Sequence, residues 1–276
     1  MTLDYPRGHL HRTYGIALSE ARKPGSIEVY LNVGSRLDDQ SDLAPIALSG
    51  LATGALRPES IHRVTLTLDG DSIQASEPSL IAIGLRNAAG MAFDPVSGDL
   101  YIQDNGVDLA DGSEDQLSAD ELDVIRAERL GDEVPDFGFP NDYIAANTGV
   151  RVGSGAEQPV VAFLPIDGGR SEGPAEITFA PPGFPDGLDA GVLVGFHGRY
   201  GLAGVANDEN PVLYVDLAER SVVPFVPNDA PDVGHLDNLL ATTDSLYMAD
   251  INRLGPMGTT APQGVIYQVK ALAEDS

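Results

Sequence analysis

The feature that most constrains the fold of this chain is a strand–turn–strand unit that recurs along it. In each copy a small apolar strand is followed by a turn and by a second strand that ends in polar residues. The first strands are 15–18, 90–93, 175–179 and 238–241, and the second strands are 28–34, 99–104, 191–198 and 245–250. Internal repeats of this kind predict a repeat architecture in which every copy supplies the same piece of sheet.

A third strand is predicted after each copy, and a fourth after three of them. The third strands are 61–68, 121–126, 211–216 and 264–269, and the fourth strands are 79–83, 159–164 and 221–226. The 31 glycines and 20 prolines agree with short strands and many turns. Radially arranged four-stranded units form a β-propeller, and apolar runs such as Val192-Leu193-Val194 suit strands buried on both faces.

We therefore predict an all-β fold in which residues 1–276 form a single β-propeller domain. About four blades are visible, at approximately residues 14–84, 88–164, 174–226 and 236–270. A β-sandwich, or two small β domains, is the alternative. The intervening segments 35–60, 105–120 and 130–158 are predicted to be long loops, and long loops often carry function.

The composition narrows the classes of partner. A formal net charge of −26 argues against nucleic acid and anionic membrane surfaces, since both need Lys and Arg to neutralise phosphate. The acidic residues are spread over turns, which indicates a solubilising surface, calcium-binding loops or adaptation to salt. The chain has no cysteine, so disulfides and thiolate chemistry are excluded. No apolar run is long enough for a membrane span, and residues 1–7 do not resemble a signal peptide.

In a propeller, ligands sit at the end of the blades where first strands begin and second strands finish. This rule predicts a rim of polar residues from several blades. Its members would be His9, His11, Arg12, Gly34-Ser35-Arg36, Arg86-Asn87, Asp104-Asn105-Gly106, His197-Gly198-Arg199, His235 and Asp250.

Several short motifs then point to a family. In order along the chain they are Gly8-His9-Leu10-His11-Arg12-Thr13, Tyr30-Leu31-Asn32-Val33-Gly34-Ser35, Gly84-Leu85-Arg86-Asn87-Ala88-Ala89-Gly90-Met91-Ala92-Phe93, Ala119-Asp120-Glu121-Leu122-Asp123-Val124-Ile125, Phe137-Gly138-Phe139-Pro140, Phe184-Pro185 and Val194-Gly195-Phe196-His197-Gly198. Together they resemble the soluble PQQ-dependent glucose/sorbosone (aldose sugar) dehydrogenases. The resemblance implies a six-bladed propeller, so that the four visible blades would belong to an N-terminally truncated relative. The alternative is a smaller ring, or one completed by a second copy as a homo-oligomer.

In that family a histidine removes a proton from the C1 hydroxyl of a sugar while a hydride passes to PQQ held by calcium. The resemblance makes His9 the catalytic base, with His11 as a neighbour that a small alignment shift would substitute. It makes Arg12, Arg86, Asn87 and Asn105 contacts of the PQQ cofactor, whose carboxylates suit an arginine. It makes the backbone carbonyls of Gly106 and Val107 ligands of calcium, which prefers oxygen.

The chain also departs from the family. Ala88-Ala89 replaces a Pro-x pair, Val107 stands where the glucose enzymes have proline, and His197-Gly198-Arg199-Tyr200 lacks the Ser-Trp-Asn of the sorbosone branch.

We therefore predict a quinoprotein-type oxidoreductase that oxidises a small sugar at C1 and passes electrons to an external acceptor. The alternatives are a non-catalytic propeller that acts as a binding module, or a calcium-dependent lactonase-type hydrolase. The family implies a periplasmic or extracellular location, whereas the absence of a signal peptide in this chain predicts a soluble cytoplasmic protein.

Overall fold

The protein is all-β throughout the part of the chain that the structure describes. The computed structural model describes residues 1–12, 15–20, 24–109, 115–165, 173–196, 212–226, 236, 238–250 and 264–272. Every regular element in these ranges is a strand, from β1 to β21, and the ranges contain no helix long and apolar enough to cross a membrane. The sequence prediction of an all-β chain is confirmed.

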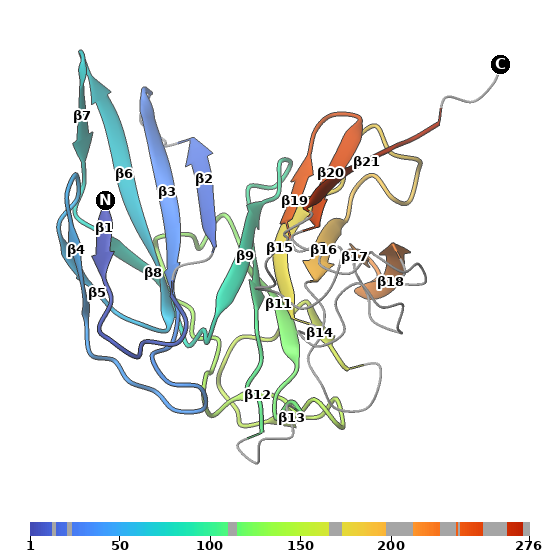
Figure 1. Ribbon diagram of the computed structural model, residues 1–276, viewed down its shortest axis with the longest axis horizontal. Coiled ribbons are helices and arrows are strands. Elements are labelled where there is room, and N and C mark those ends of the chain that lie inside the picture. The colour runs from blue at the N-terminus through green and yellow to red at the C-terminus, as the bar shows by residue number, and fades with distance from the viewer. Residues whose placement is uncertain are drawn as a thin grey trace.

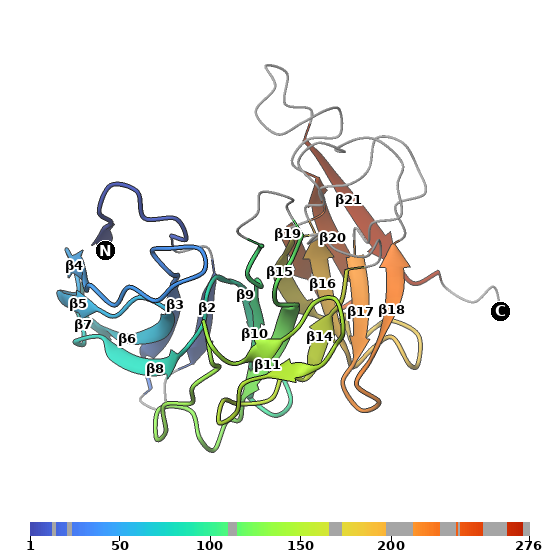
Figure 2. The ribbon, with the colours of Figure 1, turned by 90° about the horizontal axis from the view of Figure 1, so that it is seen from below.

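Four antiparallel sheets follow one another along the chain (Figure 1 and Figure 2). The first sheet contains β2 (Ile16–Glu20), β3 (Ser26–Val33), β6 (Ser60–Asp69) and β7 (Ser72–Ala75), with β8 (Ser79–Ile83) also paired to β6. The second contains β9 (Ala88–Phe93), β10 (Leu100–Asp104), β11 (Asp120–Ile125) and β14 (Val161–Phe163). The third contains β15 (Pro174–Phe179), β16 (Val192–Phe196), β17 (Val212–Asp216) and β18 (Ser221–Val226). The fourth contains β19 (Asn238–Ala241), β20 (Ser245–Asp250) and β21 (Val265–Lys270).

The first strands of neighbouring sheets lie side by side, so β2 contacts β9, β9 contacts β15, and β15 contacts β19. Glycine makes two of these approaches possible. A β-carbon on Gly15 would lie 2.8 Å from the Ala88 carbonyl oxygen, and one on Gly90 would collide with the Ala175 carbonyl. Such close approach of two backbones excludes any side chain. Among the described strands the row of sheets does not close into a ring (Figure 2).

Two smaller sheets contain strands from segments that the sequence predicts to be loops. β4 (Ile46–Ser49) and β5 (Gly54–Leu56) join β1 (Thr2–Asp4) in a three-stranded sheet. β12 (Tyr143–Ile144) pairs with β13 (Arg151–Val152). The segment 35–60, predicted to be a long loop, thus contains two short strands, whose residues Ile46, Leu48 and Leu56 are buried against the first sheet.

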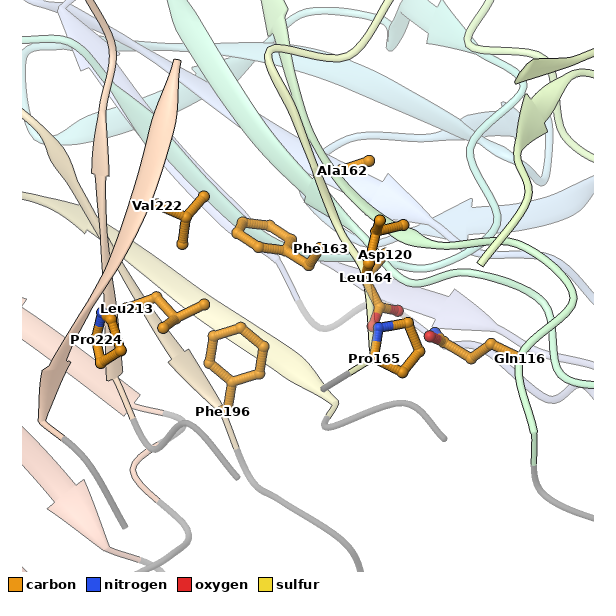
Figure 3. A pocket seen from close by; sticks show the side chains of 10 residues that line it. All are labelled: Gln116, Asp120, Ala162, Phe163, Leu164, Pro165, Phe196, Leu213, Val222 and Pro224. Carbon is orange, nitrogen blue, oxygen red and sulfur yellow. The ribbon is translucent and has the colours of Figure 1, made fainter. Parts of the chain in front are cut away.

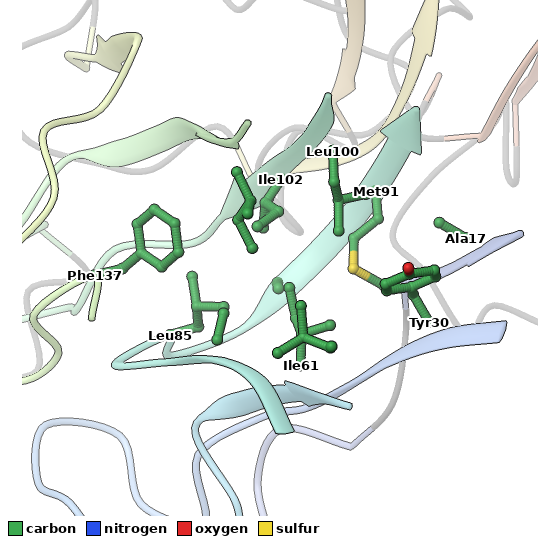
Figure 4. Close-up of a cluster of buried hydrophobic side chains, with 12 residues drawn as sticks. Ala17, Tyr30, Ile61, Leu85, Met91, Leu100, Ile102 and Phe137 are labelled. Carbon is green, nitrogen blue, oxygen red and sulfur yellow. The ribbon is translucent and has the colours of Figure 1, made fainter. Parts of the chain in front are cut away.

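The second sheet is buried on both faces by the apolar cores. Toward the first sheet, residues Leu100, Ile102 and Ile125 pack with Tyr30, Ile61, Leu85, Met91 and Phe137 (Figure 4). Toward the third sheet, Tyr101 and Leu122 pack with Phe163, Ile177, Val194 and Phe196. Since Ile102 pairs with Asp123 and Asp104 pairs with Glu121, these three carboxyl groups lie on the face toward the first sheet. Gln103 and Asp120 lie on the opposite face by the same alternation.

Candidate functional site

Three segments far apart in the sequence meet around Arg86. The Ser35 N–H donates to the Arg86 carbonyl at 2.7 Å, and the His11 N–H donates to the Ser35 carbonyl at 3.1 Å. The space between them is so narrow that a β-carbon on Gly34 would lie 2.6 Å from the His11 β-carbon. The residues predicted for one rim of the fold, in segments 9–12, 34–36 and 86–87, are thus brought together at the end of the first sheet next to β9.

The Arg86 side chain is almost completely buried and is held by Asp38. Its side chain is 6% exposed, its Nε–H donates to the Asp38 carbonyl at 3.0 Å, and its Nη2 is paired with the Asp38 carboxylate. A second carboxylate, on Asp108, lies 3.9 Å from Nη2. The positive charge of Arg86 is therefore compensated inside the protein. Sequence reasoning missed Asp38, whose position in a long segment gives no sign of this pairing.

Asp104 at the end of β10 fixes the Arg86-Asn87 turn. Its carboxylate accepts the Arg86 N–H at 2.9 Å and the Asn87 N–H at 2.6 Å. Desolvation raises the pKa of Asp104 to about 6, against the opposing effect of the two N–H donors and the Arg86 charge. Asp104 thus positions the two residues that the resemblance assigns to the cofactor.

The other predicted cofactor and calcium contacts, Asn87, Asn105, Gly106 and Val107, also form hydrogen bonds within the protein. The Asn87 amide nitrogen donates to the Asn105 side-chain oxygen at 3.1 Å, and the Asn105 amide nitrogen donates to the Pro174 carbonyl at 2.8 Å, which links the second sheet to the third. The Gly106 N–H donates to Asp120 at 2.9 Å. The Val107 carbonyl accepts the N–H groups of Leu117 and Ser118, at 2.7 and 3.2 Å. Asn87 Oδ1 is the exception, since it is buried without a hydrogen-bond partner.

Two histidines of the predicted rim, His9 and His11, differ in which ring nitrogen is available to a substrate. His9 is 4% exposed, its Nε2 contacts the Gly34 carbonyl at 3.1 Å, and its Nδ1 is buried without a partner. Its ring packs against Tyr5 at 4.7 Å, and desolvation lowers its pKa. With Nε2 on a carbonyl oxygen and Nδ1 buried, His9 has no ring nitrogen open to a substrate.

His11 presents the opposite geometry. Its Nδ1 lies 2.8 Å from the Ser35 hydroxyl oxygen, and that hydroxyl donates its own hydrogen to the Leu37 carbonyl at 2.7 Å. Ser35 can therefore only accept from His11, which assigns the proton to Nδ1 and leaves the lone pair on Nε2. Desolvation, and next the charge of Arg86, lower the pKa of His11 to about 4. A neutral imidazole with a free Nε2 is the form that a general base requires.

The remaining predicted rim residues are placed as follows. Arg12 is exposed at the end of a described range. Asp250 ends β20 and is 2% exposed. His197 and His235 lie outside the described residues.

Two other family-like motifs, Phe137–Pro140 and Ala119–Ile125, lie beside the Arg86 turn. The Phe139 N–H donates to the Gly84 carbonyl at 2.9 Å, and the Phe137 N–H donates to the Ile83 carbonyl at 3.0 Å. Gly84 has a φ of 74°, and a β-carbon there would collide with Asp136. The Phe137–Pro140 motif, the Gly84–Phe93 motif and β11 together line a cavity of about 30 Å³, whose walls include Arg86, Asp104, Glu121 and Asp142 beside apolar residues such as Phe137 and Val107. This volume holds about one water molecule.

Two further carboxyl groups lie on the same face of the second sheet. Glu121 accepts the Ile144 N–H at 3.2 Å, and burial raises its pKa. Asp123 is 1% exposed, and neither of its oxygens has a hydrogen-bond partner. Burial, together with the nearby Glu121 and Asp104, raises the pKa of Asp123 well above its usual range.

These contacts allow a test of the cofactors that the resemblance implies. Calcium would need the Val107 carbonyl, but its oxygen already accepts two N–H groups. In the described residues no three His, Cys, Asp or Glu side chains gather in a way that could hold a metal ion. A polycarboxylate such as PQQ would need Arg86, which Asp38 neutralises, and it would face a cavity of only about 30 Å³. Binding of PQQ or calcium here would therefore require the Arg86–Asp38 pair and the hydrogen bonds on the Val107 carbonyl to be exchanged for contacts with the cofactor.

The comparisons with known proteins identify the fold. No protein-family model matches the chain. The calcium structure of a carbohydrate-active enzyme of family AA12 from Trichoderma reesei superimposes with a TM-score of 0.52 at 15% identity, covering 95% of this chain and 69% of that one. At this identity the similarity shows that the two chains share a fold.

Other matches are weaker. A putative oxidoreductase (glucose dehydrogenase) from Thermus thermophilus has a TM-score of 0.44 at 18% identity, covering 88% of this chain and 61% of its own. An uncharacterised protein of Borreliella burgdorferi is 33% identical over 69 residues, which are 25% of this chain. The matched segment spans only 16% of that curated relative.

Proposed function

We propose that this chain is a β-propeller protein of the sugar-oxidoreductase type, acting on a small carbohydrate. The observation that carries the proposal is the meeting of motifs from segments 8–12, 34–36, 84–87 and 104–107 in one place, on a fold shared with an AA12 carbohydrate-active enzyme. PQQ and calcium belong to the proposal as cofactors that the family resemblance implies, and the six-bladed ring belongs to it in the same way.

In this proposal the base is His11 instead of His9. Oxidation of a sugar at C1 requires that the hydroxyl loses its proton, and a neutral imidazole accepts it through a free ring nitrogen. His11 Nε2 carries that lone pair because Ser35 fixes the proton on Nδ1. His9 has its Nε2 on the Gly34 carbonyl and its Nδ1 buried.

A second candidate is a non-catalytic propeller that binds a carbohydrate without oxidising it. It is favoured by the internal pairing of Arg86 with Asp38 and by the two N–H groups on the Val107 carbonyl. Both features stabilise the protein without a ligand.

Reconstitution separates the two candidates. The chain is incubated with PQQ and Ca²⁺, cofactor binding is measured by equilibrium dialysis, and aldose-dependent reduction of a redox dye is followed. The oxidoreductase proposal expects His11→Asn to lower turnover by about 100-fold or more, the usual contribution of a general base. His9→Asn is the matched control and should retain turnover to within about tenfold.

Asp38→Ala tests the role of Arg86. If Arg86 binds an anionic cofactor, removing its internal partner should strengthen PQQ binding by about tenfold. The oxidoreductase proposal is overturned if the wild type and Asp38→Ala both show no PQQ binding and no dye reduction. Retention of sugar binding in that case would establish the second candidate.

A further inference from the structure

A second pocket, distinct from the Arg86 site, lies between the second and third sheets. Its volume is about 220 Å³, and it is lined by Gln116, Asp120, Ala162, Phe163, Leu164, Pro165, Phe196, Leu213, Val222 and Pro224 (Figure 3). For comparison, an apolar cavity of about 150 Å³ holds one benzene molecule. The pocket therefore has room for a single six-membered ring with one substituent.

The two ends of the pocket differ in chemistry. Figure 3 shows Val222, Leu213 and Pro224 at one end, the rings of Phe163 and Phe196 in the middle, and Gln116 and Asp120 together at the other end. The two phenylalanine rings are perpendicular, with centroids 5.9 Å apart. Such an arrangement presents both a ring face and a ring edge to an aromatic occupant.

Gln116 gives the clearest sign of a ligand. It is 4% exposed, and neither its amide nitrogen nor its amide oxygen has a hydrogen-bond partner. A buried amide without partners is costly, and unlike a carboxyl group it cannot become less polar by binding a proton. Its amide end is directed toward the pocket beside Asp120 (Figure 3), so a molecule in the pocket can supply the missing donor and acceptor.

We propose that this pocket binds a small uncharged aromatic molecule that carries a carboxamide head group. The carboxamide is the matching partner of Gln116, because its N–H donates to Oε1 while its carbonyl accepts from Nε2–H. The remaining N–H of a primary amide faces the carboxylate of Asp120. The ring lies against Phe163 and Phe196, whose side chains are buried in the same core as Leu213.

Charge sets the specificity of the pocket. An aromatic carboxylate has the same shape as the amide but would place its negative charge next to Asp120, in a chain with a net charge of −26. It also offers no donor to Gln116 Oε1. The pocket should therefore reject the acid and accept the amide.

The test uses benzamide as the probe on the full chain, with saturation-transfer NMR and titration calorimetry. We expect benzamide to bind at least about tenfold more tightly than benzoate or N,N-dimethylbenzamide, because neither of these can donate to the buried Oε1 of Gln116. Gln116→Leu should remove this preference. Gln103→Leu is the matched control: Gln103 is also fully buried with both amide atoms unpaired, but it does not line the pocket.

A second variant acts at the other end of the pocket. Val222→Phe fills the apolar end without touching Gln116 and should abolish benzamide binding in a folded protein. The proposal is overturned if the wild type does not bind benzamide, or if Gln116→Leu retains the preference for benzamide over benzoate. Because this readout requires neither PQQ nor turnover, it does not depend on the proposed function.

Discussion

Both faces of the second sheet are buried, and the polar groups on the two faces are compensated for desolvation in different ways. Toward the first sheet lie carboxyl groups, of which Asp104 and Glu121 accept backbone N–H groups. Asp123 has no hydrogen-bond partner, and burial raises its pKa, which favours the protonated form. Toward the third sheet lie the amides of Gln103 and Gln116, with all their polar atoms unpaired.

A buried polar group without a partner has different consequences for different side chains. A carboxyl group in an apolar setting lowers its cost by taking up a proton. An amide cannot lower its desolvation cost by binding a proton, so an unpaired amide beside a pocket is the stronger sign of a ligand. This is why we assign the ligand site to Gln116 and not to Asp123.

Of the variants that test this difference between the two faces, Asp104→Ala should lower the free energy of unfolding the most. It removes the acceptor of two N–H groups in the Arg86-Asn87 turn, so we expect the free energy of unfolding to fall by about 2–3 kcal/mol in urea titrations. Asp216→Ala is the matched control, since Asp216 also accepts two backbone N–H groups, at 2.9 and 3.0 Å, but in an exposed turn. Equal losses in the two variants would contradict the importance of the Asp104 position.

Asp123→Asn tests the protonated state of the unpartnered carboxyl group. Because the folded state holds a proton that the unfolded state releases above its ordinary pKa of 3.8, wild-type stability should fall as pH rises through and above that value. Asparagine has no such proton, so the variant should gain stability over the wild type progressively as pH rises above 3.8. Urea titrations at each pH measure the difference, with Asp69→Asn at the exposed end of β6 as the control. A pH-independent difference would show that Asp123 does not titrate as inferred.

Gln103→Leu and Gln116→Leu should each stabilise the free protein by about 1 kcal/mol, because each replaces an unpaired buried amide with an apolar side chain of similar length. Gln74→Leu, on an exposed strand, should leave the stability unchanged. A loss of stability in both buried variants would mean that the two amides are satisfied in solution, for example by water.

The smallest expected change in stability comes from His11, whose partly buried imidazole favours the uncharged form. Its folded pKa of about 4 lies below the ordinary 6.5, so its contribution to stability is present above pH 6.5 and is lost as pH falls toward 4. The side chain is partly exposed, so we expect a change below about 1 kcal/mol. Long-range nitrogen–proton NMR should find the proton on Nδ1 and the titration below pH 5. A proton on Nε2 would remove the argument for His11 as the base.

The first and second strands of each of the four sheets could be predicted from the sequence, because each pairs with its neighbour in the chain. The runs around Met91, Tyr101 and Leu193 carry their own alternation or continuous apolar character, and the turns between them contain glycine or proline. β4 and β5 could not be predicted, since they are short, and β4 also pairs with β1, which lies far from it in the sequence.

The candidate site could be predicted only in outline. The rim rule brought His11, Ser35 and Arg86 together, but the tautomer of His11 depends on where one serine hydroxyl donates its hydrogen. Gln116 was missed because nothing in its neighbours shows that its amide is buried against another sheet. Contacts between sheets are set by their packing, and the sequence of one strand does not contain them.

The glycine approaches between sheets have a consequence for how such a chain changes over evolutionary time. At Gly15 and Gly90 the neighbouring sheets meet through backbone atoms, which are the same whatever the surrounding side chains are. A contact of this kind requires glycine at one position but does not depend on which side chain the facing residue carries. It offers a physical route by which two chains with 15% of their residues in common can retain one fold.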